Sequence, residues 1–404
     1  MAARGIQPTD AGIDFALLAA TVTAADTRIS RRTESQDSWT RELDLYVPVA
    51  DPALWNAQAV LIARTLAFLT GDRWRLSFRP RHARYRKLLE AKAALLPAPF
   101  ASVCLFSGGL DSFVGAIDLL EAKKKILFVS HYWDNSTSSQ TQCATALGSV
   151  YGDLGPRHVR VRVGFENDLV KGSEPEKTTR GRSFLFLGLA AAAASGLKGE
   201  PTIYVPENGL ISLNVPLDPL RLGAWSTRTT HPFYLARMQE ILAGVGIPGT
   251  LDNPYRFRTK GEMMRGCSNA ALLKKYAAIT ISCSSYTKGR FKGLKQGHCG
   301  YCVPCLIRRA AIVTAFAADT TRYSIPDLSA QTLDAGKAEA EDVRSFQLIG
   351  RRLAANDSLS RILVRKPGPL SDYAEKDIKE YAGVFKRGIA EVYDLIKAVK
   401  VRRL

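Results

Sequence analysis

The residues with the most distinctive chemistry directly follow one apolar run, Val103–Phe106. The run reads as a buried strand, and Ser-Gly-Gly-Leu-Asp-Ser separates it from a predicted helix. Such a turn cradles phosphate, because glycines let the backbone approach and unpaired helix N–H groups face the anion. The residues expected to bind a nucleotide here are Ser107, Gly108, Gly109, Leu110, Asp111 and Ser112.

Asp111 has a different expected role, because a carboxylate repels phosphate but holds Mg²⁺ against it. The loop is not the P-loop of kinases and GTPases, which ends in Gly-Lys-Ser or Gly-Lys-Thr. An ordinary strand–helix turn uses the same residue types for turns and caps. The six residues alone therefore leave a structural role open.

A second cluster consists of cysteines with the spacing C-x15-C-x2-C-x2-C: Cys283, Cys299, Cys302 and Cys305. Two-residue gaps let thiolates converge on one ion, and the distant cysteine closes a tetrahedron, which predicts zinc bound by four sulfurs. Four protein ligands leave no open position, so the expected role is structural. An iron–sulfur cluster is the alternative. Cys104 and Cys143 are assigned to the core, and Cys267 is left unassigned.

The elements that must position these residues alternate between strand and helix. Strands are expected at 103–106, 126–130, 158–163 and 202–205, with helices at 112–123, 140–151, 183–195 and 232–243. This pattern predicts an α/β fold with a doubly wound parallel sheet, whose ligands lie beyond the carboxyl ends of the strands. The polar residues placed there are Ser107, His131–Asp134, Glu207 and Asn208.

Three domains are predicted. Residues 1–96 read as an N-terminal α+β module in the order helix, strand, helix, strand, with Trp55 and Trp74 in its core. Residues 97–320 carry the glycine loop and the cysteines. Residues 321–404 read as a helical extension with a Pro-Gly-Pro break at 367–369.

The composition indicates a globular protein with a basic surface. The chain has 404 residues, 46% of them hydrophobic, and a formal net charge of +18. No apolar run is long enough to span a membrane, the longest being 184–194. Acidic residues near the N-terminus argue against a secretory signal. A cytoplasmic protein without membrane association is therefore expected. Segment 256–295 carries ten Lys/Arg against one Glu. Such charge suits ATP, an acidic protein or nucleic acid, the last not favoured because no basic repeat interleaves with aromatics.

Taken together, the loop and the cysteines resemble the QueC family, the 7-cyano-7-deazaguanine synthases. The resemblance covers roughly 100–320 and is carried, in the family's order, by Ser107–Ser112, Arg180–Ser183, Thr259–Glu262 and Ser282–Arg308. It implies a PP-loop (adenine nucleotide α-hydrolase-like) fold, ATP, Mg²⁺ through Asp111, structural zinc, and 7-carboxy-7-deazaguanine as substrate. Arg180, Arg182 and Lys260 are candidates to meet phosphate charge, and the candidate catalytic residues are Asp111, Ser112, Lys260 and Arg182.

The chain departs from the short synthases after its second strand (131–140), at 206–219, and by its added module and extension. In these respects the chain is more similar to the QueC-like proteins of anti-phage systems, and it is most similar to the QueC-like protein of the Qat system. This resemblance implies a role in defence, together with partner proteins encoded in the same operon. The predicted function is that of an ATP-dependent ligase, which adenylylates the deazaguanine carboxylate and then transfers the acyl group to an amine. One candidate for that amine is an amino group of a partner protein. The alternatives are a 7-cyano-7-deazaguanine synthase for tRNA or DNA modification, and a nucleotide-sensing or nucleic-acid-binding subunit without turnover.

Overall fold

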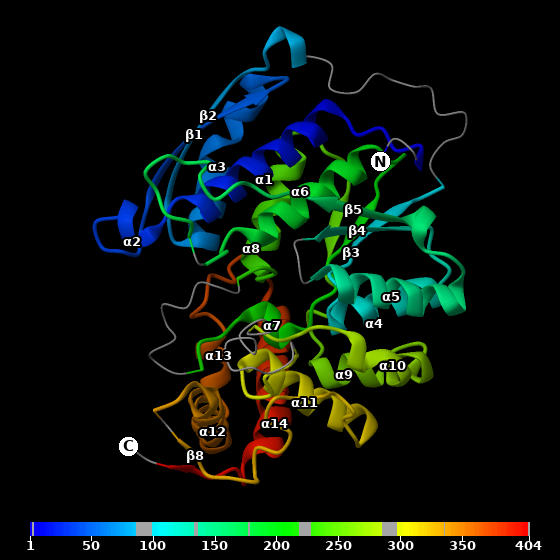
Figure 1. The fold of residues 1–404 in the computed structure, drawn as a ribbon, viewed down its shortest axis with the longest axis vertical. Helices are drawn as coiled ribbons and strands as arrows, with labels where there is room; N and C mark the ends of the chain where they lie inside the picture. Colours follow the sequence, from blue (N-terminus) through cyan, green and yellow to red (C-terminus); the bar gives the residue numbers. More distant parts are fainter. Residues whose placement is uncertain are drawn as a thin grey trace.

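The computed structural model describes residues 1, 4–85, 99–132, 136–176, 178–217, 228–284, 297–334 and 336–402 (Figure 1). Its centre is a parallel sheet with the strand order β5-β4-β3-β6-β7. The strands are β3 (Ser102–Leu105), β4 (Ile126–Tyr132), β5 (His158–Arg162), β6 (Thr202–Tyr204) and β7 (Thr250–Asp252). The order reverses at β3, which has β4 on one side and β6 on the other, and ligands of such sheets bind at this switch point.

The central strands β3 and β4 are buried on both faces, which explains why they read as continuous apolar runs. On β3, Val103 packs into the core that contains α6 (Arg182–Ser195), whereas Cys104 packs into the core that contains α4 (Leu110–Glu121). On β4, Leu127 and Phe128 alternate between the same two cores. A parallel five-stranded sheet covered in this way fits the PP-loop-like α/β fold expected from the sequence.

The N-terminal module consists of α1 (Asp10–Arg28), α2 (Arg31–Glu34), β1 (Glu42–Val49), α3 (Pro52–Thr70) and β2 (Arg73–Pro80), with β1 and β2 parallel. Asp51 caps α3, because its side chain accepts from the N–H of Leu54 at 3.1 Å. Trp55 and Trp74 are buried, as expected. Helix α1 packs along α6, so the module and the sheet share one hydrophobic core. The two boundaries between the three predicted domains stay a prediction, and the one at 96/97 lies outside the described residues.

The other helices are α5 (Ser136–Tyr151), α7 (Gly209–Leu213), α8 (Pro232–Gly244), α9 (Lys260–Arg265), α10 (Ala270–Tyr276), α11 (Val303–Phe316), α12 (Ala338–Ala355), α13 (Leu359–Leu363) and α14 (Glu375–Ile396). Short 3-10 turns lie at Ala83–Tyr85, Gly155–Arg157 and Ala277–Ile279. A small parallel pair joins β8 (Leu333–Asp334) to β9 (Val401–Arg402). The sequence analysis missed β7, β8 and β9, because two or three residues carry no readable periodicity.

The C-terminal helices lie at the opposite end of the molecule from β1 and β2 (Figure 1). Helix α14 packs against α7, α9, α11 and α12. It therefore covers the loops at the carboxyl ends of β6 and β7, rather than projecting from the molecule.

Helix α3 corrects one sequence expectation, because its length and composition suffice to cross a membrane. The sequence analysis looked for an uninterrupted apolar run, and Asn56, Gln58 and Arg64 interrupt this one. In the structure α3 packs on β2 and α8 and buries Trp55 and Leu66 in the shared core. A core helix meets the same criteria, so the cytoplasmic location and the lack of membrane association stay predictions.

Candidate functional site

The glycine loop after β3 has a backbone shape that requires glycine at Gly108. Its φ is +78°, and an added Cβ would lie 2.8 Å from Ser139 Oγ and 2.9 Å from Gln140 N. The Gly108 carbonyl accepts from Ser139 Oγ at 2.6 Å and from Ile281 N at 3.1 Å. The loop is therefore fixed from two directions, by α5 and by the segment that precedes the cysteine cluster.

Hydroxyl and amide groups line the inside of this loop. Ser107 Oγ lies 3.1 Å from Ser112 Oγ and accepts from Gly109 N at 3.2 Å. Gly109 is the N-cap of α4 and supplies no side-chain cap, so the first turn of the helix keeps N–H groups for an anion. These groups fit the phosphate cradle predicted from the sequence.

Asp111, at the start of α4, is buried and holds three hydrogen-bond donors. Its Oδ1 accepts from Lys260 Nζ at 2.5 Å, and its Oδ2 accepts from Asn208 Nδ2 at 2.7 Å and Asn208 N at 3.2 Å. Burial raises the pKa of Asp111, but the Lys260 ammonium and hydrogen bonds from Glu207, Lys260 and Asn208 outweigh burial and lower the pKa to about 2. Asp111 is therefore ionised at neutral pH.

The sequence analysis placed Glu207 and Asn208 at the end of the strand before them but gave neither a role in binding or catalysis. Asn208 holds Asp111 and also caps α7 by accepting from Ile211 N at 3.1 Å. Burial and the adjacent Asp111 carboxylate raise the pKa of Glu207 well above its ordinary value. Their position at the carboxyl end of a strand beside the switch point is the signal that finds them.

Two cavities meet at the loop and share Ser107, Gly109, Ser112 and Glu207 in their walls. The first, of about 420 Å³, extends over Lys260 toward α7 and α11, and Phe346 of α12 lines it. The second, of about 830 Å³, extends along α6 toward the N-terminal module. Its walls include Thr23, Asp26, Thr27 and Arg28 of α1.

The structure separates two arginines that the sequence analysis grouped together. Arg182 lines the second cavity, with its guanidinium carbon 5.3 Å from the centroid of the Phe186 ring. Arg180 is absent from the described lining of both cavities: its guanidinium lies 4.1 Å from the Trp39 ring centroid and donates to Thr70 O at 3.0 Å. Burial lowers the pKa of Arg180 to about 10. The loop, Lys260 and Arg182 are thus brought together, whereas Arg180 joins the N-terminal module.

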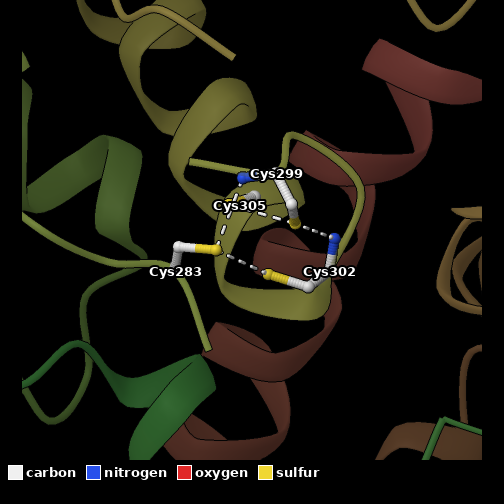
Figure 2. A group of neighbouring side chains, drawn as sticks. All are labelled: Cys283, Cys299, Cys302 and Cys305. Atoms are coloured by element: carbon white, nitrogen blue, oxygen red, sulfur yellow. Dashed lines mark hydrogen bonds between the residues drawn. The ribbon is translucent and has the colours of Figure 1, made fainter. Parts of the chain in front are cut away.

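Four cysteines converge as the spacing predicted, and their Sγ atoms all lie within 4.8 Å of one another. Figure 2 shows Cys305 on α11 and the other three side chains pointing toward a common centre. The Cys283–Cys302 and Cys299–Cys305 sulfur pairs are 3.9 and 3.8 Å apart. A tetrahedral ion with Zn–S bonds of about 2.3 Å places its sulfurs about 3.8 Å apart, so the donors fit one zinc ion. Sulfurs on different irons of a cluster would lie farther apart, which disfavours the iron–sulfur alternative.

The cysteine cluster is connected to the glycine loop through a short segment of chain. Cys283 follows Ile281 by two residues, and the Ile281 N–H donates to Gly108. The fully buried Arg308 holds the same segment by donating to Thr280 Oγ1 at 2.8 Å and Ala277 O at 2.6 Å. A metal that fixes Cys283 would therefore also stabilise the glycine loop.

Of the three other cysteines, Cys104 and Cys143 are buried in the core, as expected, and Cys267 joins the same core. Two predicted features lie outside the described residues. These are Trp133 and Asp134 after β4, and most of the basic segment between Cys283 and Cys299 (285–296).

No protein-family model matches this chain. Curated 7-cyano-7-deazaguanine synthases do match it. The synthase of Methanoregula boonei is 25% identical over 239 residues, which are 55% of this chain and 98% of that protein. Those of Hahella chejuensis and Novosphingobium aromaticivorans are each 26% identical over 56% of this chain, covering 94% and 97% of their own lengths. A shorter match, 31% over 116 residues, covers 28% of this chain and 42% of the zinc import ATP-binding protein ZnuC of Halorhodospira halophila. The three synthases, matched over nearly their whole lengths, support the resemblance of this chain to the QueC family.

Proposed function

We propose that this protein uses ATP to activate the carboxylate of a 7-carboxy-7-deazaguanine and transfers the acyl group to an amine of a partner protein, in anti-phage defence. The observation that carries the proposal is the buried Asp111–Lys260 pair, which lines the first cavity beside the glycine loop that both cavities share. One cavity has room for a nucleotide and the other for a second substrate.

The first step makes a carboxylate reactive, because its oxygen is a poor leaving group. The substrate carboxylate attacks the α-phosphorus of ATP, the bond to the β-phosphate oxygen breaks, and pyrophosphate leaves into the Ser107–Ser112 loop. Lys260 and Arg182 offset the negative charge that develops on the phosphates. The Asp111 and Glu207 carboxyls and the serine hydroxyls are oxygen donors suited to Mg²⁺, which would neutralise the leaving pyrophosphate.

In the second step an amine nitrogen attacks the acyl carbon of the adenylate. The carbon–oxygen bond to AMP breaks, AMP leaves with the electron pair, and the nitrogen loses a proton to give an amide. Ammonia as the amine leads toward the nitrile of the synthases, whereas a protein amine gives a covalent conjugate.

The walls of the two cavities support a protein as acceptor. The first is lined by Phe346 of the extension and the second by residues of α1, so segments outside 97–320 shape the space around the loop. A segment that departs from the synthase pattern, 206–217 in its described part, lines the first cavity through Leu210, Asn214 and Val215. A changed second substrate accounts for both features.

The second candidate function is synthesis of 7-cyano-7-deazaguanine, favoured by the names of the matched relatives. The two are separated by incubating the purified chain with ATP, Mg²⁺ and 7-carboxy-7-deazaguanine, with and without co-expressed operon partners. We expect pyrophosphate release and a partner whose intact mass rises by one deazaguanine acyl group.

Free 7-cyano-7-deazaguanine formed from ammonia, with no mass change on any partner, would instead identify an elaborated synthase. Absence of pyrophosphate release under all conditions would favour a sensing or nucleic-acid-binding subunit. A plaque assay with the operon carrying Asp111→Asn tests the defence role, and full protection by that variant would contradict it.

A further inference from the structure

Helix α14 of the C-terminal extension contacts the turn that carries Lys260. Glu391 accepts a hydrogen bond from Thr259 Oγ1 through Oε1, and one from Gly261 N at 3.3 Å through Oε2. Both donors adjoin Lys260 in the chain, one on each side. One carboxylate therefore holds the residues on both sides of the lysine, Thr259 through its hydroxyl and Gly261 through its backbone N–H.

Gly261 shows how closely Glu391 approaches this turn. A Cβ added to Gly261 would lie 2.6 Å from Glu391 Oε1 and 2.9 Å from its carboxyl carbon. A larger side chain at this position would displace the carboxylate, so the close contact between α14 and this turn depends on glycine.

Arg387, one helical turn before Glu391, holds the same turn from a second point. Its Nε lies 2.6 Å from Glu262 Oε1, and it donates to Phe257 O at 2.9 Å. Glu262 closes the N-terminal capping box of α9 by accepting from Thr259 N at 2.9 Å. The short helix α9 is thus fixed by its own cap and by two side chains of α14.

The placement of this turn decides where the Lys260 ammonium lies. Lys260 is the first residue of α9, is 6% exposed, and extends to Asp111 at the edge of the first cavity. A lysine that must meet phosphate charge depends on its position, since a displacement of about 1 Å can cost about 100-fold in rate.

We propose that Glu391 is a positioning residue that acts through Lys260, so that the C-terminal extension is part of the ATP-cleaving machinery. This inference rests on the proposed function, in which Lys260 meets the phosphates during adenylylation. The inference distinguishes two roles of the extension, support of ATP cleavage and docking of a partner. If the extension only docked a partner, altering it would leave pyrophosphate release unchanged.

The test compares Glu391→Ala, Glu391→Gln, Lys260→Ala and the double variant Glu391→Ala/Lys260→Ala in the full-length protein. Glu380→Gln is the matched control, because Glu380 is exposed on the same helix. Single-turnover pyrophosphate release gives the rate and the KM for ATP, and thermal unfolding reports the folded state of each variant.

We expect Glu391→Ala to lower the rate of pyrophosphate release about 10- to 100-fold with the KM for ATP changed less than about threefold. Glu391→Gln keeps one acceptor oxygen, so the logarithm of its rate should fall by no more than half as much as that of Glu391→Ala. In the Lys260→Ala background the Glu391 substitution should cost nothing further, because two residues that act through one interaction are not additive.

A rate unchanged in Glu391→Ala, or an equal loss with and without Lys260, would overturn the inference while leaving the proposed function standing. Normal pyrophosphate release from Lys260→Ala would instead remove the site assignment on which both rest. If Glu391→Ala does not fold, Glu391→Gln replaces it in the same comparison. A loss of rate seen only when Lys260 is present supports the inference, and an equal loss in the Lys260→Ala background contradicts it.

Discussion

Asp111 Oδ1 lies 2.5 Å from Lys260 Nζ, although 149 residues separate them in the chain, and both side chains are 7% exposed. Asp111 lies in the first turn of α4, after the glycine loop that follows β3, and Lys260 begins α9, after the loop that follows β7. The two helices pack side by side, so their first turns meet at the carboxyl edge of the sheet. This pair links the glycine loop to the Thr259–Glu262 motif.

Substitution of Asp111 should abolish ATP cleavage and also reduce stability. Asp111→Asn removes the negative partner of a buried lysine, and such a loss costs about 3–5 kcal/mol. The measurements are pyrophosphate release and urea unfolding. The stability cost arises because both members of the pair are buried.

The double variant Asp111→Asn/Lys260→Met serves as its control, because it removes both charges. It should recover much of the stability but none of the activity. Normal pyrophosphate release from folded Asp111→Asn would contradict the assignment of the site.

Arg180 and Arg182 should respond in opposite ways when each is replaced by alanine. Arg182→Ala removes a cation that lines the second cavity and should lower kcat/KM for ATP about 10- to 100-fold with little change in Tm. Arg180→Ala removes the contact with Trp39 and Thr70 and should lower Tm with a smaller effect on kcat/KM. Equal kinetic effects of the two variants would show that the cavity lining does not distinguish them.

The purified protein should contain about one zinc ion per chain by elemental analysis. Cys302→Ser should lose the metal and become prone to aggregation, because a structural thiolate site contributes directly to folding. Cys104→Ser is the control, since Cys104 is also buried but lies outside the cluster. Iron at similar stoichiometry with visible absorbance would support the cluster alternative.

A buried group of four charges in the N-terminal module should be a main contributor to its stability. Arg41 Nη2 lies 3.0 Å from Asp26 Oδ1 and 2.7 Å from Asp72 Oδ2, and Arg31 contacts the same two carboxylates. Arg41→Met leaves these carboxylates short of a buried partner and should cost about 3–5 kcal/mol. The exposed pair Arg75–Asp44 provides the control, because water screens an exposed ion pair and Arg75→Met should therefore change the free energy of unfolding far less. Equal costs in urea unfolding would contradict this account.

Two buried histidines should make the protein less stable below pH 6.5. Burial, with smaller contributions from nearby arginines, lowers the pKa of His158 to about 4 and that of His231 to about 3. The unfolded chain then binds more protons than the folded one between pH 6.5 and 4, so the free energy of unfolding falls as the pH falls.

The loss is about 1.4 kcal/mol for each histidine and each pH unit within that window. Urea unfolding at pH 7.5, 6.5 and 5.5 measures it. His158→Gln should flatten the dependence, whereas the same change at the exposed His82 should not. An unchanged slope in His158→Gln would show that His158 does not titrate in this way.

Local sequence determined the elements around the site and the four cysteines that converge. Apolar runs predicted β3 and β4, because a strand buried on both faces needs apolar side chains at most positions. The Ser107–Ser112 loop was readable because its glycines serve a local backbone shape. The cysteine spacing was readable because three of the four ligands lie within seven residues, where the chain itself limits their separation.

Tertiary structure alone decided which distant groups meet. Arg180 and Arg182 are two residues apart, yet the chain turns between them into α6, so that one faces the N-terminal module and the other a cavity. Nothing local marks Glu391, an acidic residue on an amphipathic helix, as a partner of Thr259 and Gly261 130 residues away. Such contacts follow from how helices pack on the sheet, and helix packing depends on the shapes of whole faces rather than on any short pattern of residues.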